Sequence, residues 1–330
     1  MITTRVTEMF GLTYPIMSAP MALHCGGILA AAVSKAGALG SFGGLHPQKD
    51  TDWLLNEIAY IRTTTDQPFA VGFISDFIPV FPRFFDAALE VKPPIIALSF
   101  GNPEPWVSKA KASGAKVMCQ VQTMQLARDA VAAGADILVA QGNEAGGHTG
   151  RMNLLPFLAH VVDTFPDVPV MAAGGVASGR TLAAALAAGA DGAWVGTAFL
   201  ATPEAVEVSE EHRCRIVESD GEDTVYTEVL DIVEEKVFGI KWPEGIAARA
   251  YRNRFVNRWH QREHDLRSQL DEVVPAYAQA LRQRDPEATA ILMGQSAAFV
   301  DAVRPAGEVV RVICEDAERV LRERSSRLLK

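Results

Sequence analysis

Short apolar runs alternate with longer segments of helical periodicity over residues 14–200. The runs are apolar throughout, which is typical of parallel strands whose two faces are both covered by protein. The segments between them are apolar at positions i, i+3 and i+4, as in amphipathic helices. The pattern predicts eight strands, at residues 15–19, 38–43, 69–74, 95–100, 116–121, 136–140, 169–175 and 192–199.

One junction is repeated, in which a helical segment ends at a glycine just before an apolar run. It occurs in AAVSKAGALGS, AAGADILVA and AALAAGADGAWVG. Glycine suits this place because it readily adopts the left-handed conformation that ends a helix. Eight strand–helix units in so short a stretch fit a closed barrel better than an open sheet. The predicted fold class is therefore α/β, a (β/α)8 TIM barrel.

The alternation of apolar runs and helical segments ends after the eighth predicted strand. Residues 204–284 are richer in charge and contain few strand-like runs, so we expect helices there. The last stretch, AGEVVRVICEDAERVLRERSSRLLK, has the pattern of an amphipathic helix that packs back on the barrel. The prediction is a ligand-binding TIM barrel domain, residues 1–203 plus 304–330, and a mainly helical insertion or lid, residues 204–303.

The net charge of -9 and the isoelectric point near 5.3 argue against binding to nucleic acids or anionic membranes, which usually needs a basic surface. One basic stretch, residues 249–267, also carries aromatic side chains, and we interpret it as an amphipathic helix with a solvated face. The sequence shows no signal peptide and no membrane-spanning segment. We therefore expect a cytoplasmic protein.

The four cysteines lie far apart and form no CxxC pair, which argues against a zinc site or a redox dithiol. A reduced cytoplasmic setting is the simpler interpretation. Cys25 lies beside His24 and could be read as a thiol nucleophile. That alternative is disfavoured because Cys25 opens a helix, where small residues are common.

Glycines end the last two predicted strands, in AAGGV (172–176) and VGTAF (195–199). In a barrel of this type the loops after strands seven and eight commonly hold a phosphate group near a helix N-terminus. Gly175 and Gly196 would let the backbone approach the phosphate, and Thr197 would add a hydroxyl. No GxGxxG follows the first strand and no GxxxxGK[ST] occurs, which disfavours Rossmann and P-loop nucleotide binding.

The stretch QGNEAGGHTG, residues 141–150, follows the sixth strand, at the same end of the barrel as the loops after strands seven and eight. Gly146 and Gly147 would let the chain pass close to a flat ligand, and His148 would face the barrel mouth. Histidine titrates near neutrality, which suits proton transfer. His148 could instead stabilise the loop, while a metal ligand is disfavoured because no second histidine lies at ligand spacing. Glu144, four residues earlier, could orient the loop or could simply be solvated, and the sequence does not decide between the two roles.

Residues after the first and fifth strands complete the candidate site. The segment from Ala19 through Pro20 to Met21 would line the ring of a cofactor at the barrel mouth. Gln120 and Gln141 end strands five and six. Their amides could bind a ring or ribityl hydroxyls, or they could simply complete the backbone bonding of their own strands.

The sequence resembles the nitronate monooxygenase family, formerly called 2-nitropropane dioxygenases, in four stretches: PIMSAPMA, AQGNEAGGHTG, PVMAAGGVASGRTLAAALAAGADGAWVGTAFLAT and GQSAAFVDAVRPAGEVV. Members of this family are FMN-dependent (β/α)8 barrels with a helical insertion. The likeness runs over most of the chain, is most specific in its middle third and is weak across residues 204–284.

The resemblance implies FMN as the cofactor, with its phosphate on Gly175, Gly196 and Thr197. It implies that His148 is the catalytic histidine, which serves as base for neutral nitroalkanes and helps to bind the nitronate anion. The nitronate would reduce the flavin and O2 would reoxidise it, yielding a carbonyl compound and nitrite. No metal is expected, and the expected cofactor-binding residues are Ala19, Pro20, Met21, Gly72, Gln120, Gln141, Gly146, Gly147, Gly174, Gly175, Gly196 and Thr197.

Two positions depart from the family's pattern. Relatives often have Asn in the third strand where this chain has Gly72, and Arg after the Gly-Thr pair where it has Ala198. Both positions touch the flavin or its surroundings, so the departures bear on substrate choice and flavin tuning.

Flavin-dependent enoyl-ACP reductases and NADH:quinone reductases share this barrel, glycine cradle and histidine loop, and they take electrons from a nicotinamide. No short motif separates them from nitronate oxidation. A non-catalytic flavin-binding protein is a third alternative, which the histidine at the rim disfavours. The partners expected are a small-molecule nitronate or nitroalkane and O2. The apolar faces of the insertion and the last helix would form either a lid or a homodimer interface.

Overall fold

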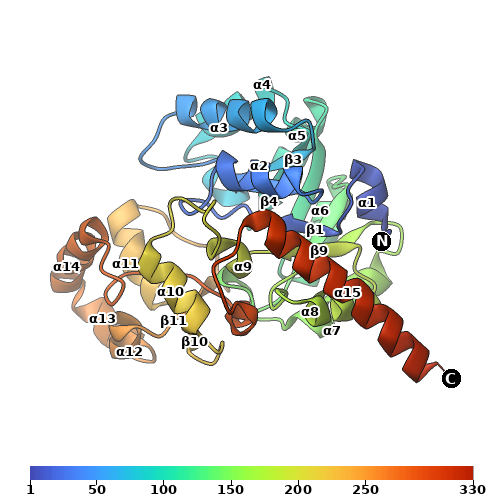
Figure 1. Cartoon of the computed structure of the whole chain (residues 1–330). Coiled ribbons are helices and arrows are strands. Elements are labelled where there is room, and N and C mark those ends of the chain that lie inside the picture. Colours follow the sequence, from blue (N-terminus) through green and yellow to red (C-terminus); the bar gives the residue numbers. More distant parts are fainter. Residues whose placement is uncertain (330) are drawn as a thin grey trace.

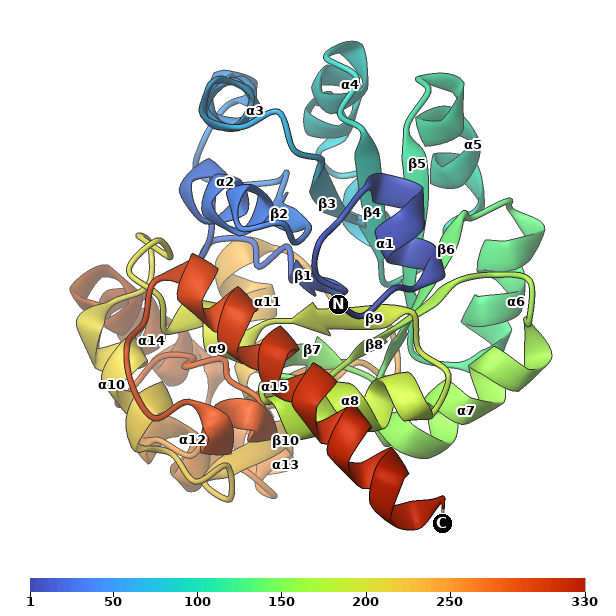
Figure 2. The same cartoon turned by 45° about the vertical axis from the view of Figure 1, so that its right-hand side comes forward.

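Eight parallel strands close into a barrel in the computed structural model, which describes residues 1–329 (Figures 1 and 2). The ring closes because the Leu39 N–H donates to the Ile16 carbonyl and the Ser18 N–H donates to the Leu39 carbonyl, both at 3.0 Å. The predicted TIM barrel is confirmed. Its strands follow the spatial order β1-β9-β8-β6-β5-β4-β3-β2, and they are β1 (Ile16–Ser18), β2 (Gly40–Gly43), β3 (Phe69–Ile74), β4 (Ile95–Ser99), β5 (Lys116–Val121), β6 (Ile137–Gln141), β8 (Val170–Ala173) and β9 (Gly192–Val195).

Both faces of the barrel strands are buried, as the uninterrupted apolar runs predict. Because side chains alternate along a strand, Ile95 and Ala97 of β4 join Met118 in the cluster inside the barrel. Ile96 and Leu98 point the other way and pack among the residues that the helices bury. A continuous apolar run is therefore what each strand needs.

Helices cover the outside of the barrel (Figure 2). The ends of α6 follow from local sequence, since the Thr123 hydroxyl accepts a hydrogen bond from the Leu126 N–H at its start and Gly134 follows its end at φ +92°. The predicted glycine junctions are confirmed. The helices are α1 (Arg5–Phe10), which precedes the first strand, α2 (Gly27–Lys35), α3 (Thr51–Thr64), α4 (Pro82–Glu90), α5 (Glu104–Ala112), α6 (Met124–Ala132), α7 (Leu154–Thr164) and α8 (Gly179–Ala187); β3 also continues into a short 3-10 turn, Ser75–Phe77.

The eighth strand is shorter than predicted, and the expectation that it runs to residue 199 was wrong. β9 ends at Val195, and the next residues form the short helix α9 (Thr197–Leu200). The chain turns here because the Gly196 carbonyl accepts hydrogen bonds from the N–H groups of Phe199 and Leu200. Thr197 therefore stands at the start of a helix.

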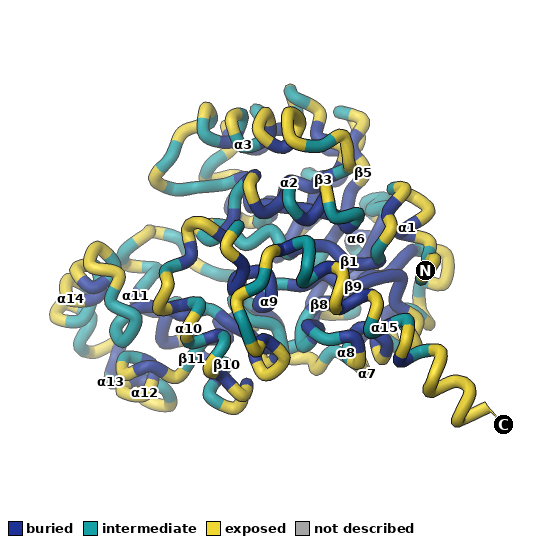
Figure 3. The backbone as a smooth tube through the Cα atoms, viewed as in Figure 1, coloured by how far each residue is buried: buried dark blue, intermediate teal, exposed yellow. Residues whose placement is uncertain are grey.

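The C-terminal helix takes the place of the eighth barrel helix. α15 (Ala306–Leu328) packs against α8 and α2, and it buries Val310, Ile313 and Ala317. Its last turns extend beyond the barrel and are exposed (Figure 3). The predicted return of this helix to the barrel is confirmed, so the insertion separates the eighth strand from its helix.

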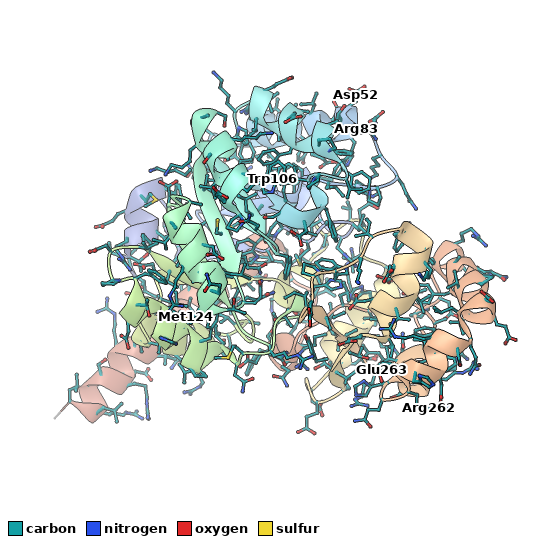
Figure 4. All side chains as sticks on the ribbon, turned by 180° about the vertical axis from the view of Figure 1, so that it is seen from behind. Asp52, Arg83, Trp106, Met124, Arg262 and Glu263 are labelled. Carbon is teal, nitrogen blue, oxygen red and sulfur yellow. The ribbon has the colours of Figure 1, made fainter. Side chains whose placement is uncertain are left out.

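The insertion between α9 and α15 has a hydrophobic core of its own, around Trp259, Tyr277 and Leu230. Two strands that the sequence pattern did not indicate form an antiparallel sheet with a barrel loop. β10 pairs with β11, and β11 pairs with β7 (Gly147–Thr149). Figure 4 shows this lobe from behind, with Arg262 and Glu263 at its edge. The elements are α10 (Glu210–Glu218), β10 (Thr224–Thr227), α11 (Val229–Phe238), β11 (Ala247–Tyr251), α12 (Arg254–Trp259), α13 (Glu263–Ser268), α14 (Leu270–Gln283) and a 3-10 turn, Gln295–Phe299.

The basic stretch 249–267 is not the single amphipathic helix that we predicted. It begins inside β11 and continues as the two short helices α12 and α13. Arg249 is buried rather than solvated, because β11 pairs with the distant β7 and places Arg249 opposite Gly147. Among residues 1–329, no helix combines the length and hydropathy that crossing a membrane requires.

Candidate active site

A cavity of about 310 Å³ opens where the barrel strands end. Its size lies within the range of small-molecule sites, and its walls are largely apolar with a few polar groups, as is common for such sites. The barrel brings every residue of the predicted site to this one cavity. Those lining residues are Ala19, Pro20, Met21, Gly72, Gln120, Gln141, Gly146, Gly147, His148, Gly174, Gly175, Gly196 and Thr197.

The glycine end of the cavity has the features of an anion site. Gly174 and Gly175 follow β8 in the left-handed conformation, at φ +101° and +71°. Within residues 1–329, the N–H groups of Gly175, Gly196 and Thr197 make no hydrogen bond. Gly175 lies shortly before α8, and Gly196 and Thr197 lie at the start of α9. Unpaired N–H groups near helix N-termini are suited to a phosphate. The residues present therefore fit the phosphate of a flavin nucleotide.

Thr197 and Gly196 are arranged so that a ligand can reach them. The Thr197 hydroxyl oxygen accepts a hydrogen bond from the Gly294 N–H at 2.9 Å, which leaves its proton for a ligand oxygen. A Cβ on Gly196 would lie 3.6 Å from Met21 Sδ, an ordinary contact distance. The fold therefore does not itself require glycine at position 196.

Other glycines of the predicted set have packing roles. A Cβ on Gly72 would lie 2.4 Å from the Pro20 side chain, and one on Gly146 would lie 2.4 Å from the Gly294 nitrogen. Glycine at these two positions lets Pro20 and the segment at Gly294 come close to the backbone. Both positions line the cavity, and direct cofactor contact by them stays a prediction.

Gln141 holds the histidine loop. Its Nε2 donates to the His148 carbonyl at 3.0 Å, while its Oε1 accepts from Gln122 Nε2 at 2.9 Å. The amide therefore has protein partners at both ends, in addition to lining the cavity. Its predicted contact with a cofactor is not tested by these bonds.

Glu144, which the sequence left without a role, caps the N-terminus of the next helix through its side chain. Its carboxylate accepts from the Leu154 N–H at 3.1 and 3.0 Å, and Leu154 is the first residue of α7. Asn153, the residue before that helix, makes no side-chain cap of its own. A negative charge at this end of a helix is favourable, so Glu144 ties the loop to α7.

His148 is held between two side chains that the insertion supplies. Its Nε2 lies 2.6 Å from Asp231 Oδ1, and its ring stacks on Trp242 with centroids 3.4 Å apart and planes at 13°. Asp231 lies on α11 and Trp242 in the loop that follows it. Among the residues described, His148 Nδ1 has no hydrogen-bond partner, so it is the ring nitrogen left for a ligand.

Glu234 is a further site residue that sequence reasoning missed. It lines the cavity one helical turn after Asp231, and its Oε1 accepts a hydrogen bond from the Tyr277 hydroxyl at 2.6 Å. Burial raises the pKa of Glu234, which favours its neutral form. The i, i+3 spacing of Asp231 and Glu234 in VLDIVEEKVF was the signal available in the sequence.

Aromatic and aliphatic side chains wall the cavity beside His148. Trp242 meets Phe77 and Phe100 edge to face, with ring centroids 4.9 and 5.2 Å apart. Phe238 and Ile240 extend this apolar surface. Within the part of the chain that the structure describes, neither lysine nor arginine lines the cavity, so a second anionic group on a substrate meets no cation there.

Cys25 has the environment of an inert thiol. It is buried, and burial raises the pKa of its thiol far above the usual range, which opposes the thiolate that a nucleophile requires. His24 beside it lines the cavity and packs its ring edge-on against His212, with centroids 5.6 Å apart. Burial lowers the pKa of His24. A neutral Cys25 thiol is a poor nucleophile, which favours His148 as the candidate catalytic residue.

Comparison with known proteins agrees with this geometry. The family model described as nitronate monooxygenase matches residues 3–79 and 78–316. The chain belongs to the nitronate monooxygenase family. A curated relative from Staphylococcus saprophyticus, named probable nitronate monooxygenase, is 30% identical over 311 residues, which cover 80% of this chain and 83% of the relative. The resemblance seen in the sequence is confirmed.

Solved structures agree over the whole length of the chain. FabK from Thermotoga maritima has a TM-score of 0.85 at 31% identity, covering 99% of this chain and 100% of that one. Nitroalkane oxidase from Streptomyces ansochromogenes has a TM-score of 0.80 at 28% identity, covering 97% and 99%. This nitronate monooxygenase family member is an enzyme, a flavin-dependent oxidoreductase.

Proposed function

We propose that the enzyme uses FMN and O2 to oxidise alkyl nitronates, and also neutral nitroalkanes, to a carbonyl compound and nitrite. The observation that carries the proposal is His148, which lines the cavity with Nε2 bound to Asp231 and Nδ1 free. A histidine presented in this way can accept a proton from a substrate carbon. Family membership supports the same chemistry.

FMN would be held at the glycine end, by the N–H groups of Gly175, Gly196 and Thr197 and by the Thr197 hydroxyl. Bound FMN supplies an acceptor for an electron pair from the nitronate and passes the pair to O2. The protein's part is to orient the substrate and to control the proton. Trp242, with Phe77 and Phe100 around it, covers one face of the His148 ring with apolar surface.

His148 acts differently on the two substrates. A neutral nitroalkane must lose its α-proton to become a nitronate, and Nδ1 is the atom that takes it. A nitronate enters already deprotonated and needs no base. Protonated His148 would then pair with the anionic nitro group, which gives the residue a binding role for that substrate.

We infer that the substrate carries a neutral, apolar chain. The wall beside His148 consists of Phe238, Ile240 and Trp242, and no lysine or arginine in residues 1–329 lines the cavity. Burying a carboxylate without a cation is costly. Nitronates of simple alkanes should therefore be turned over with a higher kcat/KM than propionate 3-nitronate.

A second candidate is an NAD(P)H-dependent flavin reductase. It is favoured by the match to FabK over nearly the full length of both chains and by the apolar wall of the cavity, against which an acyl chain could pack. The two functions differ in the electron donor. Anaerobic mixing of the FMN-loaded enzyme with an alkyl nitronate, and separately with NADH or NADPH, decides between them, because the flavin loses its colour when reduced.

The base is tested by replacing His148 in the FMN-loaded enzyme. His148→Ala should abolish oxidation of the neutral nitroalkane, retain FMN and keep most of the kcat for the preformed nitronate at a raised KM. His160→Ala, in the half of α7 away from the cavity, is the matched control. Bleaching of the flavin by a nicotinamide alone would overturn the proposal, and normal nitroalkane turnover in His148→Ala would remove the base.

A further inference from the structure

We propose that Asp231 is a positioning residue that fixes the tautomer of His148, so that Nε2 carries the proton and Nδ1 is the basic atom. The proposal rests on the proposed function of His148 as a base. It concerns a different residue, on the insertion rather than the barrel. Its expected signature is the protonation pattern of the imidazole itself.

The contact between the two side chains is short and shielded. Asp231 Oδ1 lies 2.6 Å from His148 Nε2, and the side chains are 15% and 11% exposed. A carboxylate can only accept a hydrogen bond, so the neutral imidazole must place its single proton on Nε2. The lone pair of the neutral ring then lies on Nδ1.

The rest of the structure leaves the imidazole little other freedom. β7 pairs with β11, with His148 opposite Ala248, and Gln141 holds the His148 carbonyl. Trp242 covers one face of the ring. A half-turn of the ring about the Cβ–Cγ bond would put Cε1 in place of Nε2 and Cδ2 in place of Nδ1, and the hydrogen bond to Asp231 favours the orientation seen here.

Asp231 itself has no other evident task. Its second oxygen, Oδ2, is buried and has no hydrogen-bond partner within the described residues. A carboxylate that served the packing of α11 would be expected to satisfy both oxygens, because buried polar atoms are almost always paired. The unpaired Oδ2 is therefore consistent with an Asp231 carboxylate whose role is its contact with His148.

The neighbouring acid does not compete for that role. Glu234 binds Tyr277 instead of His148, and burial raises the pKa of Glu234. The negative charge of Asp231 acts in the same direction. Asp231 is therefore the acid that contacts the imidazole, on a helix fixed by the buried Leu230 and Val233.

The test uses the FMN-loaded enzyme labelled with nitrogen-15 in histidine. In the wild-type protein the neutral His148 ring should show a protonated Nε2 and a bare Nδ1. Asp231→Asn should populate both tautomers, because an amide can donate as well as accept, and Asp231→Glu should restore the first. Asp231→Ala removes the acceptor altogether, and it replaces Asp231→Asn in this measurement if the Asn variant fails to fold.

Turnover provides the second measurement. Asp231→Asn should lower kcat for a neutral nitroalkane by about 10- to 100-fold, the range found when a metal-binding histidine loses the carboxylate that orients it. Its FMN content should stay near wild type, and its kcat for the preformed nitronate, which needs no base, should fall less than its kcat for the nitroalkane. Glu235→Gln, on the same helix but outside the cavity, is the control.

The outcomes separate this proposal from the proposed function. An unchanged His148 tautomer in Asp231→Asn overturns the positioning role whatever the substrate proves to be. An equal loss with nitroalkane and nitronate, together with a lower Tm, also overturns it by showing a structural role. A wild-type enzyme inactive on both substrates would contradict the proposed function alone, because the tautomer measurement needs no turnover.

Discussion

The indole of Trp242 lies flat on the imidazole of His148, with ring centroids 3.4 Å apart and planes at 13°. Trp242 belongs to the loop between α11 and β11, whereas His148 belongs to a barrel loop. The stacking therefore joins the two parts of the chain at the candidate catalytic residue. The insertion completes the site as well as covering it.

Removing the Trp242 indole should weaken substrate binding without abolishing activity. We expect Trp242→Ala to lower kcat/KM for an apolar nitroalkane by about 2- to 10-fold, as stacked aromatic pairs contribute about 0.5–1.5 kcal/mol. Trp242→Phe keeps an aromatic face and should lie nearer to wild type. Steady-state kinetics with a short and a long nitroalkane measure the effect. Equal kinetics for the wild type and Trp242→Ala would contradict a role of the ring in substrate binding.

A substitution at Gly196 should narrow the predicted phosphate site without straining the fold. A Cβ at this position meets Met21 Sδ at 3.6 Å and Ala19 Cβ at 3.7 Å, both ordinary contacts, and it occupies cavity space. Gly196→Ala should weaken FMN binding by about tenfold, or about 1.4 kcal/mol, at an unchanged Tm. Titration of the apoprotein, followed by FMN fluorescence, measures this.

Gly307→Ala is the matched control for that titration. Gly307 lies in the first turn of α15, and a Cβ there would contact only Ala36, at 3.5 Å. FMN should bind this variant as it binds the wild type. Unaltered FMN affinity in Gly196→Ala would mean that the cofactor phosphate lies elsewhere.

Arg249 ties the insertion to the barrel loop and should be important for stability. It is buried, and its guanidinium donates to the Asn143 carbonyl at 2.8 Å, to Asn143 Oδ1 at 2.5 Å and to Thr224 Oγ1 at 3.2 Å. Arg249→Met leaves these acceptors unpaired and should cost about 2–4 kcal/mol of unfolding free energy. Urea denaturation measures the loss. The exposed Arg254→Met should cost under about 0.5 kcal/mol, and a similar loss in both variants would refute this role.

The stability of the protein should fall in mild acid because of His212. This residue is buried, and desolvation lowers its pKa to about 4. In the unfolded chain the pKa of histidine is near 6.5, so the folded state prefers the neutral ring. The stabilisation is complete above about pH 6.5 and is lost as the pH falls toward about 4, by about 3 kcal/mol at most.

The variant His212→Gln isolates that contribution. Its amide can still donate to the Leu292 carbonyl, the partner of His212 Nε2, but it does not titrate. Its unfolding free energy should change less between pH 7 and pH 4.5 than that of the wild type. His264→Gln, at an exposed position, should keep the wild-type slope. An identical slope in His212→Gln would show that other groups dominate.

The sequence by itself determined the barrel. The strands at 69–74 and 116–121 coincide with β3 and β5, because a strand covered on both faces must be apolar along its whole length. Helix ends at Thr123 and Gly134 follow from hydrogen bonds and backbone angles within a few residues. Since strand ends in a barrel share one rim, the loop containing His148 and the glycines after β8 could be placed together from sequence alone.

Only the tertiary structure decided how His148 is held. Its partner Asp231 lies 83 positions away, and Trp242 farther still, in a region whose pattern indicated helices and nothing more. β11 is a strand because β7 supplies the hydrogen-bonding edge opposite it. Contacts of this kind depend on how separately folded segments are brought together, and no local periodicity records that.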